Sequence, residues 1–309
     1  MDLLASAASL TGPMKELRQR CAACRCQCAL GAPAGGRVVG KGASAVCTLY
    51  NLRTCDRDAH PGASAIVQKV VHLRGDRSSR AALRELRVLQ LLEKKAKHCV
   101  HFYHAVMDSS VIRFCLEAHE AGTLREFLKT THVPPKAFQF QVLISVLRGL
   151  HELQGAGFSH GDIKPANILL RRDGTVALCD FGLATPIDDR TDDMAPCPTA
   201  GYCAAECFLS ERSGGPPADI WALGITAWEC AAGEHPVLSK CHPEQGFWAI
   251  SQRLSELPAE AAALAAPAAH DPDVYKWRLI ASMIRFDPQR RITTTSALQM
   301  VQSAERFYS

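Results

Sequence analysis

A glycine-rich turn and a lysine–glutamate pair near the start of the chain have types and spacing suited to binding phosphate groups. Gly40 and Gly42 lie in the stretch 39–46, between two predicted strands. A residue without a Cβ lets backbone N–H groups approach phosphate oxygens. Lys69 ends a predicted strand, and Glu85 follows sixteen residues later in a predicted helix. A salt bridge between them would hold the ammonium group against the phosphates of a nucleotide. A plain hairpin and a solvated surface pair are the alternatives.

The most specific signal comes from two strings in the middle of the chain. Residues 159–170 read Ser-His-Gly-Asp-Ile-Lys-Pro-Ala-Asn-Ile-Leu-Leu, and residues 178–184 read Leu-Cys-Asp-Phe-Gly-Leu-Ala. They resemble the catalytic loop and the metal-binding motif of eukaryotic-type protein kinases, in the form typical of serine/threonine kinases. Later strings resemble further landmarks of that family in the family's order; they are residues 199–206, 219–224 and 287–293. The resemblance covers roughly residues 37–300.

The resemblance implies a role in phosphoryl transfer for each matching side chain. Asp162 would accept or orient the proton of the attacking hydroxyl group, and Lys164 would reach the γ-phosphate. Asn167 and Asp180 would hold Mg²⁺, or Mn²⁺ in its place. ATP and a divalent cation are thus the implied cofactors, and protein substrates are the implied partners.

Residues outside these strings would complete the nucleotide site by the same resemblance. Val46 is expected against the nucleotide, and Leu116 matches the gatekeeper position. Backbone groups around Glu117 and His119 would hydrogen-bond the adenine ring.

The resemblance also implies supporting contacts. Thr199 would support the pair of Asp162 and Lys164, and Glu206 would form a buried ion pair with Arg291. Breaking such a pair costs about 3–5 kcal/mol. A hydrophobic column would join the two lobes; its members would be His160, Phe181 and Leu89.

Several positions depart from the family pattern. Gly161 replaces the usual arginine of the catalytic loop, which normally pairs with a phosphorylated activation-loop residue. Activity is therefore expected to be independent of activation-loop phosphorylation. Two usual glycines of the family pattern are replaced, one by Ala45 and one by Pro198. A usual proline is replaced by Ala205. This loosened pattern is similar to that of kinases from large DNA viruses. A pseudokinase that serves as a binding or scaffold module is the alternative function, and a small-molecule kinase of related fold is the third.

The elements that must position these residues follow from periodicity. Short β-branched runs predict strands over 37–69 and 100–117, and an apolar stripe predicts a helix over 79–93. Helices are expected from Pro135 onward, over 218–230 and over 275–285, with an Asp-Gly hairpin between 168–170 and 176–178. The alanine- and proline-rich stretch 256–272 indicates a low-complexity surface insertion. The predicted class is α+β, a bilobal kinase fold with a strand-rich lobe containing one helix and a larger, mainly helical lobe.

The domain organisation follows from these patterns. Residues 1–36 would form a flexible tail with a possible helix over 15–27, and residues 37–305 the kinase domain, divided into lobes at 37–117 and 118–305. Four cysteines crowd into the tail, while the other ten are scattered singly. For the tail cluster, no specific role, lipidation or redox chemistry, and zinc binding remain open; its members are Cys21, Cys24, Cys26 and Cys28.

Composition bounds the remaining classes. The 309 residues are 47% hydrophobic and 21% charged, which excludes wholesale disorder, collagen and coiled coil. The net charge of +4 is too small to argue for a nucleic-acid partner. Fourteen cysteines in a chain of this length indicate reduced thiols. With no convincing targeting segment or transmembrane run, an intracellular protein is expected, cytoplasmic or nuclear, or in a host cell if viral. The oligomeric state stays open.

Overall fold

The chain forms two compact units in a computed structural model. The structure describes residues 35–42, 45–51, 63–93, 96–108, 110–187, 199–210, 214–241, 246–265 and 272–304. The N-terminal unit comprises the described residues up to Glu93 together with Val100–Ala118, and the C-terminal unit comprises residues 96–99 and those from His119 onward. The predicted tail helix and the cysteine cluster at 21–28 lie outside the described residues.

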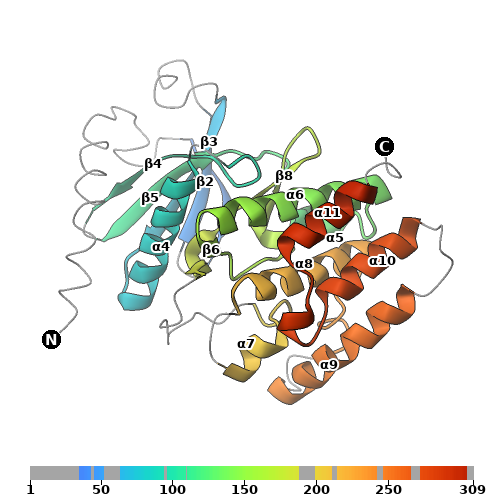
Figure 1. Ribbon diagram of the computed structural model, residues 1–309. Coiled ribbons are helices and arrows are strands. Elements are labelled where there is room, and N and C mark those ends of the chain that lie inside the picture. Colours follow the sequence, from blue (N-terminus) through green and yellow to red (C-terminus); the bar gives the residue numbers. More distant parts are fainter. Residues whose placement is uncertain are drawn as a thin grey trace. The chain divides into compact units, whose positions relative to one another are not determined.

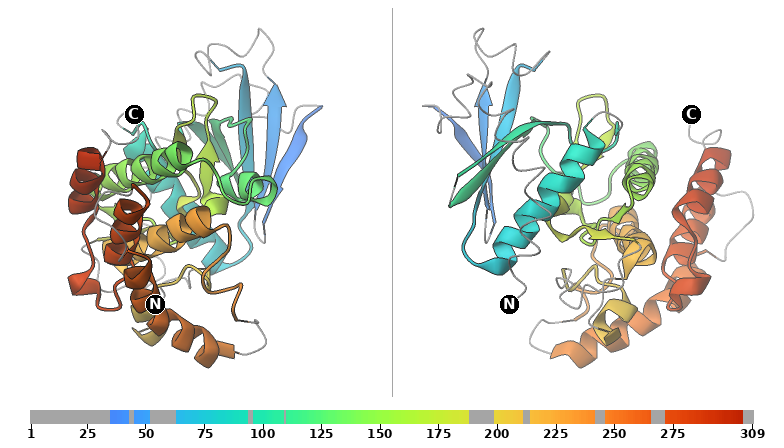
Figure 2. Two further views of the ribbon diagram at one scale, coloured as in Figure 1. Left: turned by 90° about the vertical axis from the view of Figure 1, so that its right-hand side faces the viewer. Right: turned by 60° about the vertical axis from the view of Figure 1, so that its left-hand side comes forward.

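A five-stranded antiparallel sheet forms the N-terminal unit, in the order β1-β2-β3-β5-β4 (Figure 1). The strands are β1 (Arg37–Lys41), β2 (Ala45–Asn51), β3 (Ala65–His72), β4 (Phe102–Met107) and β5 (Val111–Glu117). Helix α4 (Asp76–Leu92) contacts β3 and β4 and lies across one face of the sheet (Figure 2). The strands expected over 37–69 and 100–117 are therefore confirmed where the structure describes these ranges, with β3 continuing past Lys69 to His72, and α4 is the one helix among the described residues of this unit.

Helix α4 begins three residues before the predicted start at Ser79. Gly75, with φ of +90°, turns the chain into the helix, and the hydroxyls of Ser78 and Ser79 donate to its carbonyl oxygen at 3.1 and 3.0 Å. The apolar stripe is buried, with Leu86 and Leu89 5% and 1% exposed. Burial of this stripe, rather than capping, fixes which face of the helix meets the sheet.

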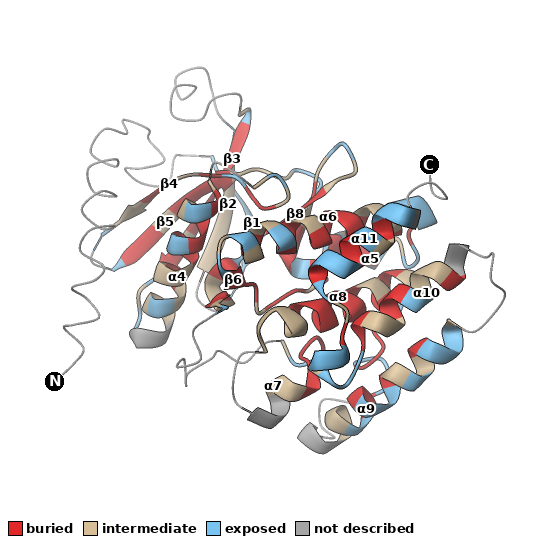
Figure 3. Ribbon diagram, viewed as in Figure 1, coloured by how far each residue is buried: buried red, intermediate tan, exposed pale blue. Residues whose placement is uncertain are grey.

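Helices make up most of the C-terminal unit. They are α5 (Leu124–Thr130), α6 (Lys136–Gly155), α7 (Ala205–Ser210), α8 (Gly215–Ala232), α9 (Gly246–Leu264), α10 (Pro272–Met283) and α11 (Thr294–Ala304). This unit also has two short antiparallel sheets of two strands each. In one, β6 (Phe158–Ser159) pairs with β9 (Thr185–Pro186); in the other, β7 (Ile168–Leu170) forms a hairpin with β8 (Val176–Leu178). The expected helices and the Asp-Gly hairpin are confirmed. Helices α6 and α8 are largely buried, whereas α9 and α11 expose one face (Figure 3).

The described part of the stretch 256–272, up to residue 265, is not the low-complexity surface insertion that its composition predicted, while residues 266–271 lie outside the described residues. Helix α9 runs through it to Leu264, with Pro258 inside. Leu254, Leu257 and Ala261 are fully buried at helical spacing. On another side of the helix Arg253 forms ion pairs with Glu256 and Glu260. Alanine is the strongest helix former, so an alanine-rich sequence with one apolar stripe folds as a helix despite the proline.

None of the described helices is long and apolar enough to cross a membrane.

Candidate active site

A buried ion pair ties strand β3 to helix α4 in the N-terminal unit. Lys69 Nζ donates to both carboxylate oxygens of Glu85, at 2.7 and 2.8 Å. The two residues are 8% and 3% exposed. The structure therefore forms this pair and excludes the solvated alternative. Because both charges are desolvated, removing one of them leaves the other uncompensated, at a cost of about 3–5 kcal/mol.

The glycine-rich turn joins β1 to β2. The amide of Gly42 donates to the carbonyl oxygen of Ala45 at 2.9 Å and closes the turn. A Cβ on Gly40 would come no closer than 3.6 Å to its nearest neighbour, and one on Gly42 no closer than 3.8 Å. Neither glycine has a positive φ. The fold itself would accept alanine at both positions, so the described neighbours give no packing reason for glycine, whereas close approach of a ligand would.

The other residues expected at the nucleotide lie in and just after the sheet. Val46 is half-buried in β2, and Leu116 is buried in β5. The amide of Glu117 donates to the carbonyl oxygen of His101 at 2.9 Å. This N–H is thus used within the N-terminal unit, and adenine would have to be bound by other backbone groups of the segment. His119 is the first described residue of the C-terminal unit after that strand.

The carboxylate of Asp162 is the centre of a polar network in the C-terminal unit. Oδ2 accepts from Lys164 Nζ at 2.6 Å and from Asn167 Nδ2 at 2.9 Å. Oδ1 accepts from the hydroxyl of Thr199 at 2.8 Å, and that hydroxyl also accepts from Lys164 Nζ at 2.7 Å. The support expected from Thr199 is present. These contacts hold the carboxylate, in a residue only 8% exposed, in a single orientation.

Asn167 and Asp180 offer oxygen donors suited to a hard cation. Asn167 closes the 3₁₀ turn η2 (Pro165–Asn167), and its Nδ2 also donates to the carbonyl oxygen of Asp162 at 2.8 Å. The two Nδ2 bonds turn the amide oxygen to the other side of the group. Asp180 has φ of +66°, the only positive value at a non-glycine residue in the described part of the chain, a strain of about 1–3 kcal/mol that tends to cluster at functional sites. Mg²⁺ keeps waters and phosphate oxygens and needs only one or two such side chains, so these residues fit the ion.

Helix α8 anchors the peptide groups that precede Asp162. The amides of His160 and Gly161 donate to the two carboxylate oxygens of Asp219, at 2.7 and 2.8 Å. Burial raises the pKa of Asp219, while the nearby His160 ring and the hydrogen bonds from both amides oppose that shift. The loop is thereby fastened to helix α8 directly before Asp162.

Gly161 is required by the fold at its position. Its φ is +79°, and a Cβ there would lie 2.5 Å from the carbonyl oxygen of Leu183. The residue that replaces the usual arginine therefore sits where a side chain has neither the conformation nor the space. Nearby, the rings of His160 and Phe181 contact each other with centroids 5.3 Å apart, as expected for two members of the hydrophobic column.

The expected ion pair between Glu206 and Arg291 is confirmed. Arg291 Nη1 and Nη2 donate to the two carboxylate oxygens of Glu206 at 2.6 and 3.0 Å. The guanidinium also lies over the ring of Trp221, 5.1 Å from its centroid. The pair fixes α7 to the segment that precedes α11.

A second polar cluster was missed in the sequence. Tyr202 donates its hydroxyl to Glu229 Oε2 at 2.7 Å, and Arg125 donates to Glu229 Oε1 at 2.5 Å and to the Tyr202 oxygen. Burial raises the pKa of Tyr202, so the hydroxyl remains a donor. The members of the three pairs are 27, 77 and 104 positions apart in the sequence. All three residue types are common in proteins, so no local sequence pattern could have predicted the cluster. The cluster thus holds the chain at Tyr202, three residues after Thr199.

One hollow in the C-terminal unit is bounded by catalytic-loop residues. This hollow, named the polar hollow after the two carboxylates in its otherwise largely apolar lining, encloses about 500 Å³, including space open to solvent. Its walls include Gly161, Asp162 and Asp219, together with Cys203 and Cys207. Two carboxylates and two thiols therefore line the same hollow.

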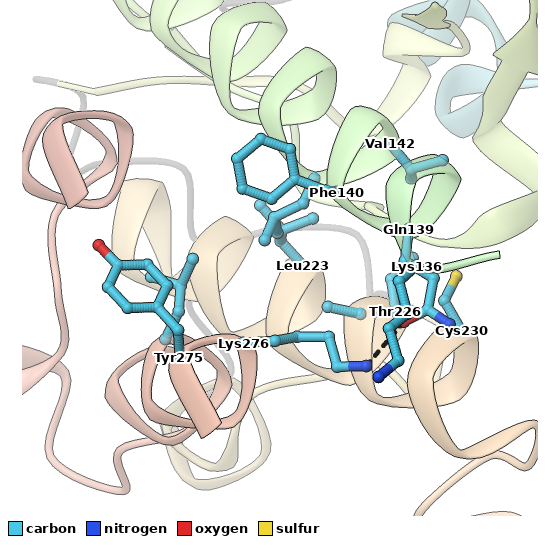
Figure 4. A pocket seen from close by; sticks show the side chains of 12 residues that line it. Lys136, Gln139, Phe140, Val142, Leu223, Thr226, Cys230, Tyr275 and Lys276 are labelled. Carbon is cyan, nitrogen blue, oxygen red and sulfur yellow. Dashed lines mark hydrogen bonds between the residues drawn. The ribbon is translucent and has the colours of Figure 1, made fainter. Parts of the chain in front are cut away.

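A second hollow lies between α6, α8 and α10 (Figure 4). This apolar hollow encloses about 560 Å³, including space open to solvent, and aliphatic and aromatic side chains such as Phe140 and Leu223 line most of it. Lys276 Nζ donates to Gln139 Oε1 at 2.9 Å across its edge. None of the site residues expected from the sequence borders it.

Comparison with known proteins places the chain among kinases. The family model described as "Protein kinase domain" matches residues 35–302. The chain is 30% identical over 224 residues to "Mitogen-activated protein kinase kinase 1c" of Physcomitrium patens, an alignment covering 70% of this chain and 62% of the relative. It is 33% identical over 156 residues to "Serine/threonine-protein kinase ppk11" of Schizosaccharomyces pombe, covering 50% and 49%.

A third relative is "Dual specificity mitogen-activated protein kinase kinase dSOR1" of Drosophila melanogaster, 31% identical over 179 residues, covering 56% of this chain and 43% of the relative. The chain thus spans less than two thirds of the length of these relatives.

Proposed function

Because the chain belongs to the protein kinase family, we propose that it is an active protein kinase, which transfers the γ-phosphoryl group of ATP to serine or threonine hydroxyls of protein substrates. The observation that carries this proposal is the Asp162 carboxylate, held on both oxygens by side chains that reach it from three positions of the chain. A fold used only for binding would have no need of a carboxylate ordered in this way.

Asp162 would act on the substrate hydroxyl. Its carboxylate accepts a hydrogen bond from that hydroxyl and takes the proton as the oxygen attacks phosphorus. Lys164, already 2.6 Å from the carboxylate, supplies positive charge for the oxygens of the transferred group. Thr199 and Asn167 keep the carboxylate from rotating, which places the hydroxyl before reaction and lowers the entropic barrier.

Other side chains would bind the nucleotide and the ion. Asn167 and Asp180 would hold Mg²⁺ or Mn²⁺, which when bound neutralises charge on the β- and γ-phosphate oxygens. Lys69, oriented by Glu85, would bind the α- and β-phosphates. The glycine-rich turn would offer backbone N–H groups to the phosphates.

Serine/threonine specificity is supported by Lys164 and by the printed name of the fission-yeast relative. The fruit-fly relative is named as dual-specificity, so phosphoamino-acid analysis of the product tests this part of the proposal. Phosphoserine and phosphothreonine are expected, and a product consisting of phosphotyrosine would contradict it.

Independence from activation-loop phosphorylation is supported by Gly161, which lacks the guanidinium that would bind a phosphate. Phosphatase treatment before the assay, followed by removal of the phosphatase, should leave the rate within about two-fold. A loss of most of the activity would refute this part alone.

The decisive experiment compares phosphate incorporation from Mg-ATP into a generic protein substrate by the wild type, Lys69→Met and Asp180→Asn. Each variant should lose on the order of 100-fold or more, as when one electrostatic contact to the transition state is removed. Lys129→Met, which changes an exposed lysine of α5, should keep the wild-type rate. No incorporation by the folded wild type would instead favour a pseudokinase, and incorporation unaffected by either variant would point to a contaminant.

A further inference from the structure

Two thiols meet in the wall of the polar hollow. Cys203 lies just before α7 and Cys207 within it, both side chains line this hollow, and the Cys203 thiol is close enough to Cys207 to stabilise its thiolate. Neither is in a disulfide, and Cys203 is only 2% exposed while Cys207 is half-buried. This contact corrects the expectation that the core cysteines are scattered singly, because four residues of separation bring these two side chains together.

The surroundings of Cys207 favour its thiolate form. A Cβ built on Gly214 would lie 2.7 Å from Cys207 Sγ, so the sulfur rests directly against that glycine, whose N–H donates to it. The hydrogen bond from Cys203 is the largest cause of a lowered pKa of Cys207, with the Gly214 amide and Arg291 acting in the same direction. Burial and the charge of Glu206 oppose this shift. A partly exposed thiolate is the nucleophilic form of cysteine.

We propose that Cys203 and Cys207 form a dithiol modification site, at which a peroxide oxidises Cys207 and Cys203 then closes an intramolecular disulfide. The Cys207 thiolate attacks one oxygen of hydrogen peroxide, the O–O bond breaks, and hydroxide leaves. The sulfur of Cys203 then attacks the sulfenic acid, the S–O bond breaks, and a second hydroxide leaves. The two thiol protons convert both hydroxides to water, so the thiols lose two electrons and the peroxide gains them.

The hydrogen-bonded geometry assigns different parts to the two thiols. Cys207 is the accessible thiol, and it receives the stabilising hydrogen bonds. Cys203 is only 2% exposed, and its thiol interacts with the sulfur that it would attack. Cys207 is therefore the thiol that meets the oxidant, and Cys203 is the resolving thiol.

Closing the disulfide would disturb the active site. The two sulfurs must approach from hydrogen-bond contact to about 2.05 Å, which shifts the backbone beside Tyr202. That residue is held by Glu229, and Thr199, bonded to Asp162, lies three positions before it. Oxidation is thus expected to lower phosphotransfer at least ten-fold, and dithiothreitol to restore it. This second expectation rests on the proposed kinase activity.

The test uses the full, reduced chain and hydrogen peroxide as the probe. After brief exposure, remaining thiols are alkylated and the segment 191–212 is analysed by mass spectrometry. We expect a Cys203–Cys207 disulfide, recognised by the loss of two hydrogens and fragment ions that link the two residues. Cys47, also half-buried, is the control for exposure and should remain reduced at the dose that oxidises half of Cys207.

Variants separate this pair from other cysteines. Cys203→Ser should abolish the disulfide, whereas Cys197→Ser, a change in the same segment but outside the described residues, should leave it unchanged. The proposed dithiol site would be refuted if Cys207 were oxidised no faster than Cys47. It would also be refuted if Cys207 formed its disulfide with Cys197. A full phosphotransfer rate in the oxidised protein would overturn the coupling to the active site. A chain that phosphorylates nothing when reduced would refute the proposed function, yet the mass measurement would still decide the dithiol site.

Discussion

Two hollows of similar size in the C-terminal unit differ in what their walls can do. The apolar hollow encloses about 560 Å³ and the polar hollow about 500 Å³. In the first, leucines and aromatic rings of α6, α8 and α10 face one another, and the Lys276–Gln139 bond lies at the edge. In the second, Asp162 and Asp219 are each held by donors that fix both carboxylate oxygens.

The volume of a hollow therefore does not identify a site in this molecule. Burying a carboxylate is energetically unfavourable unless it is hydrogen-bonded. In the polar hollow, several donors therefore bind Asp162 and Asp219 and hold them in place. The apolar hollow contains little that chemistry could use, and its side chains contribute packing. Substitutions in the wall of the polar hollow should therefore change the rate, and those in the wall of the apolar hollow should change stability.

The largest expected effect is that of Asp162→Asn in the polar hollow. The amide cannot take the proton of the substrate hydroxyl, so kcat should fall about 10²–10⁴-fold. Because asparagine has nearly the same shape, the free energy of unfolding should change far less than the activation free energy. Steady-state kinetics and urea unfolding of the same preparation check both statements. A kcat within ten-fold of the wild type would show that the two walls do not differ in function.

The next effect is on stability, from Leu279→Ala in the apolar hollow. Leu279 is 1% exposed, and truncating a buried leucine costs about 2–5 kcal/mol. The urea midpoint should drop accordingly, while kcat per folded molecule stays within about two-fold of the wild type. Leu279→Met, which conserves volume, should cost less than about 1.5 kcal/mol. A large loss of kcat at unchanged stability would assign catalytic work to the apolar wall.

A smaller effect is expected where the polar hollow depends on a glycine. Gly161→Ala forces a Cβ to within 2.5 Å of the Leu183 carbonyl oxygen at a φ of +79°. The matched control is Gly174→Ala, because Gly174 has a φ of +83° but no atom within 4 Å of the added Cβ. Strained backbone conformations cost about 1–3 kcal/mol. Both variants should lose stability, measured by thermal unfolding, but only Gly161→Ala should also lose activity, since the clash displaces the residue preceding Asp162. Equal behaviour of the two variants would remove the steric argument.

The catalytic loop and the ion pair of Lys69 could be predicted from the sequence because each rests on local information. Four chemically distinct residues within eight positions identify the loop, and one strand followed by one amphipathic helix brings Lys69 to Glu85. For residues 256–265 the alanine- and proline-rich composition gave a wrong prediction, because the buried apolar spacing of Leu257 and Ala261, continued from Leu254, is that of a helix.

The cluster around Glu229 could not be predicted, since its bonds join residues up to 104 positions apart and only the packing of α5 against α8 brings them together. The pairing of Cys203 with Cys207 lies between these cases. Four residues of separation place side chains on one face of a helix, but Cys203 lies outside α7, so its side-chain direction depended on the loop.

The smallest effect concerns His235, which packs its ring against Tyr202 at the rim of the polar hollow, with centroids 4.7 Å apart. Its Nδ1 accepts from the amides of Val237 and Leu238 at 3.1 and 3.0 Å. Burial lowers the pKa of His235 to about 4 from 6.5, Arg125 acts in the same direction, and Glu229 opposes both. Between these two values the unfolded chain binds more protons than the folded one, so stability falls as the pH decreases.

The expected loss is about 1.4 kcal/mol per pH unit below 6.5 for one fully titrating group. His235→Asn keeps a side-chain oxygen that can accept from the two amides but does not titrate. The free energy of unfolding of the wild type, minus that of this variant, should therefore decrease between pH 7 and pH 5, as followed by urea denaturation. A difference that stays constant over this range would mean that the ring is protonated in the folded state as readily as in the unfolded chain. The packing of His235 against Tyr202 would then impose no electrostatic cost on the rim of the polar hollow.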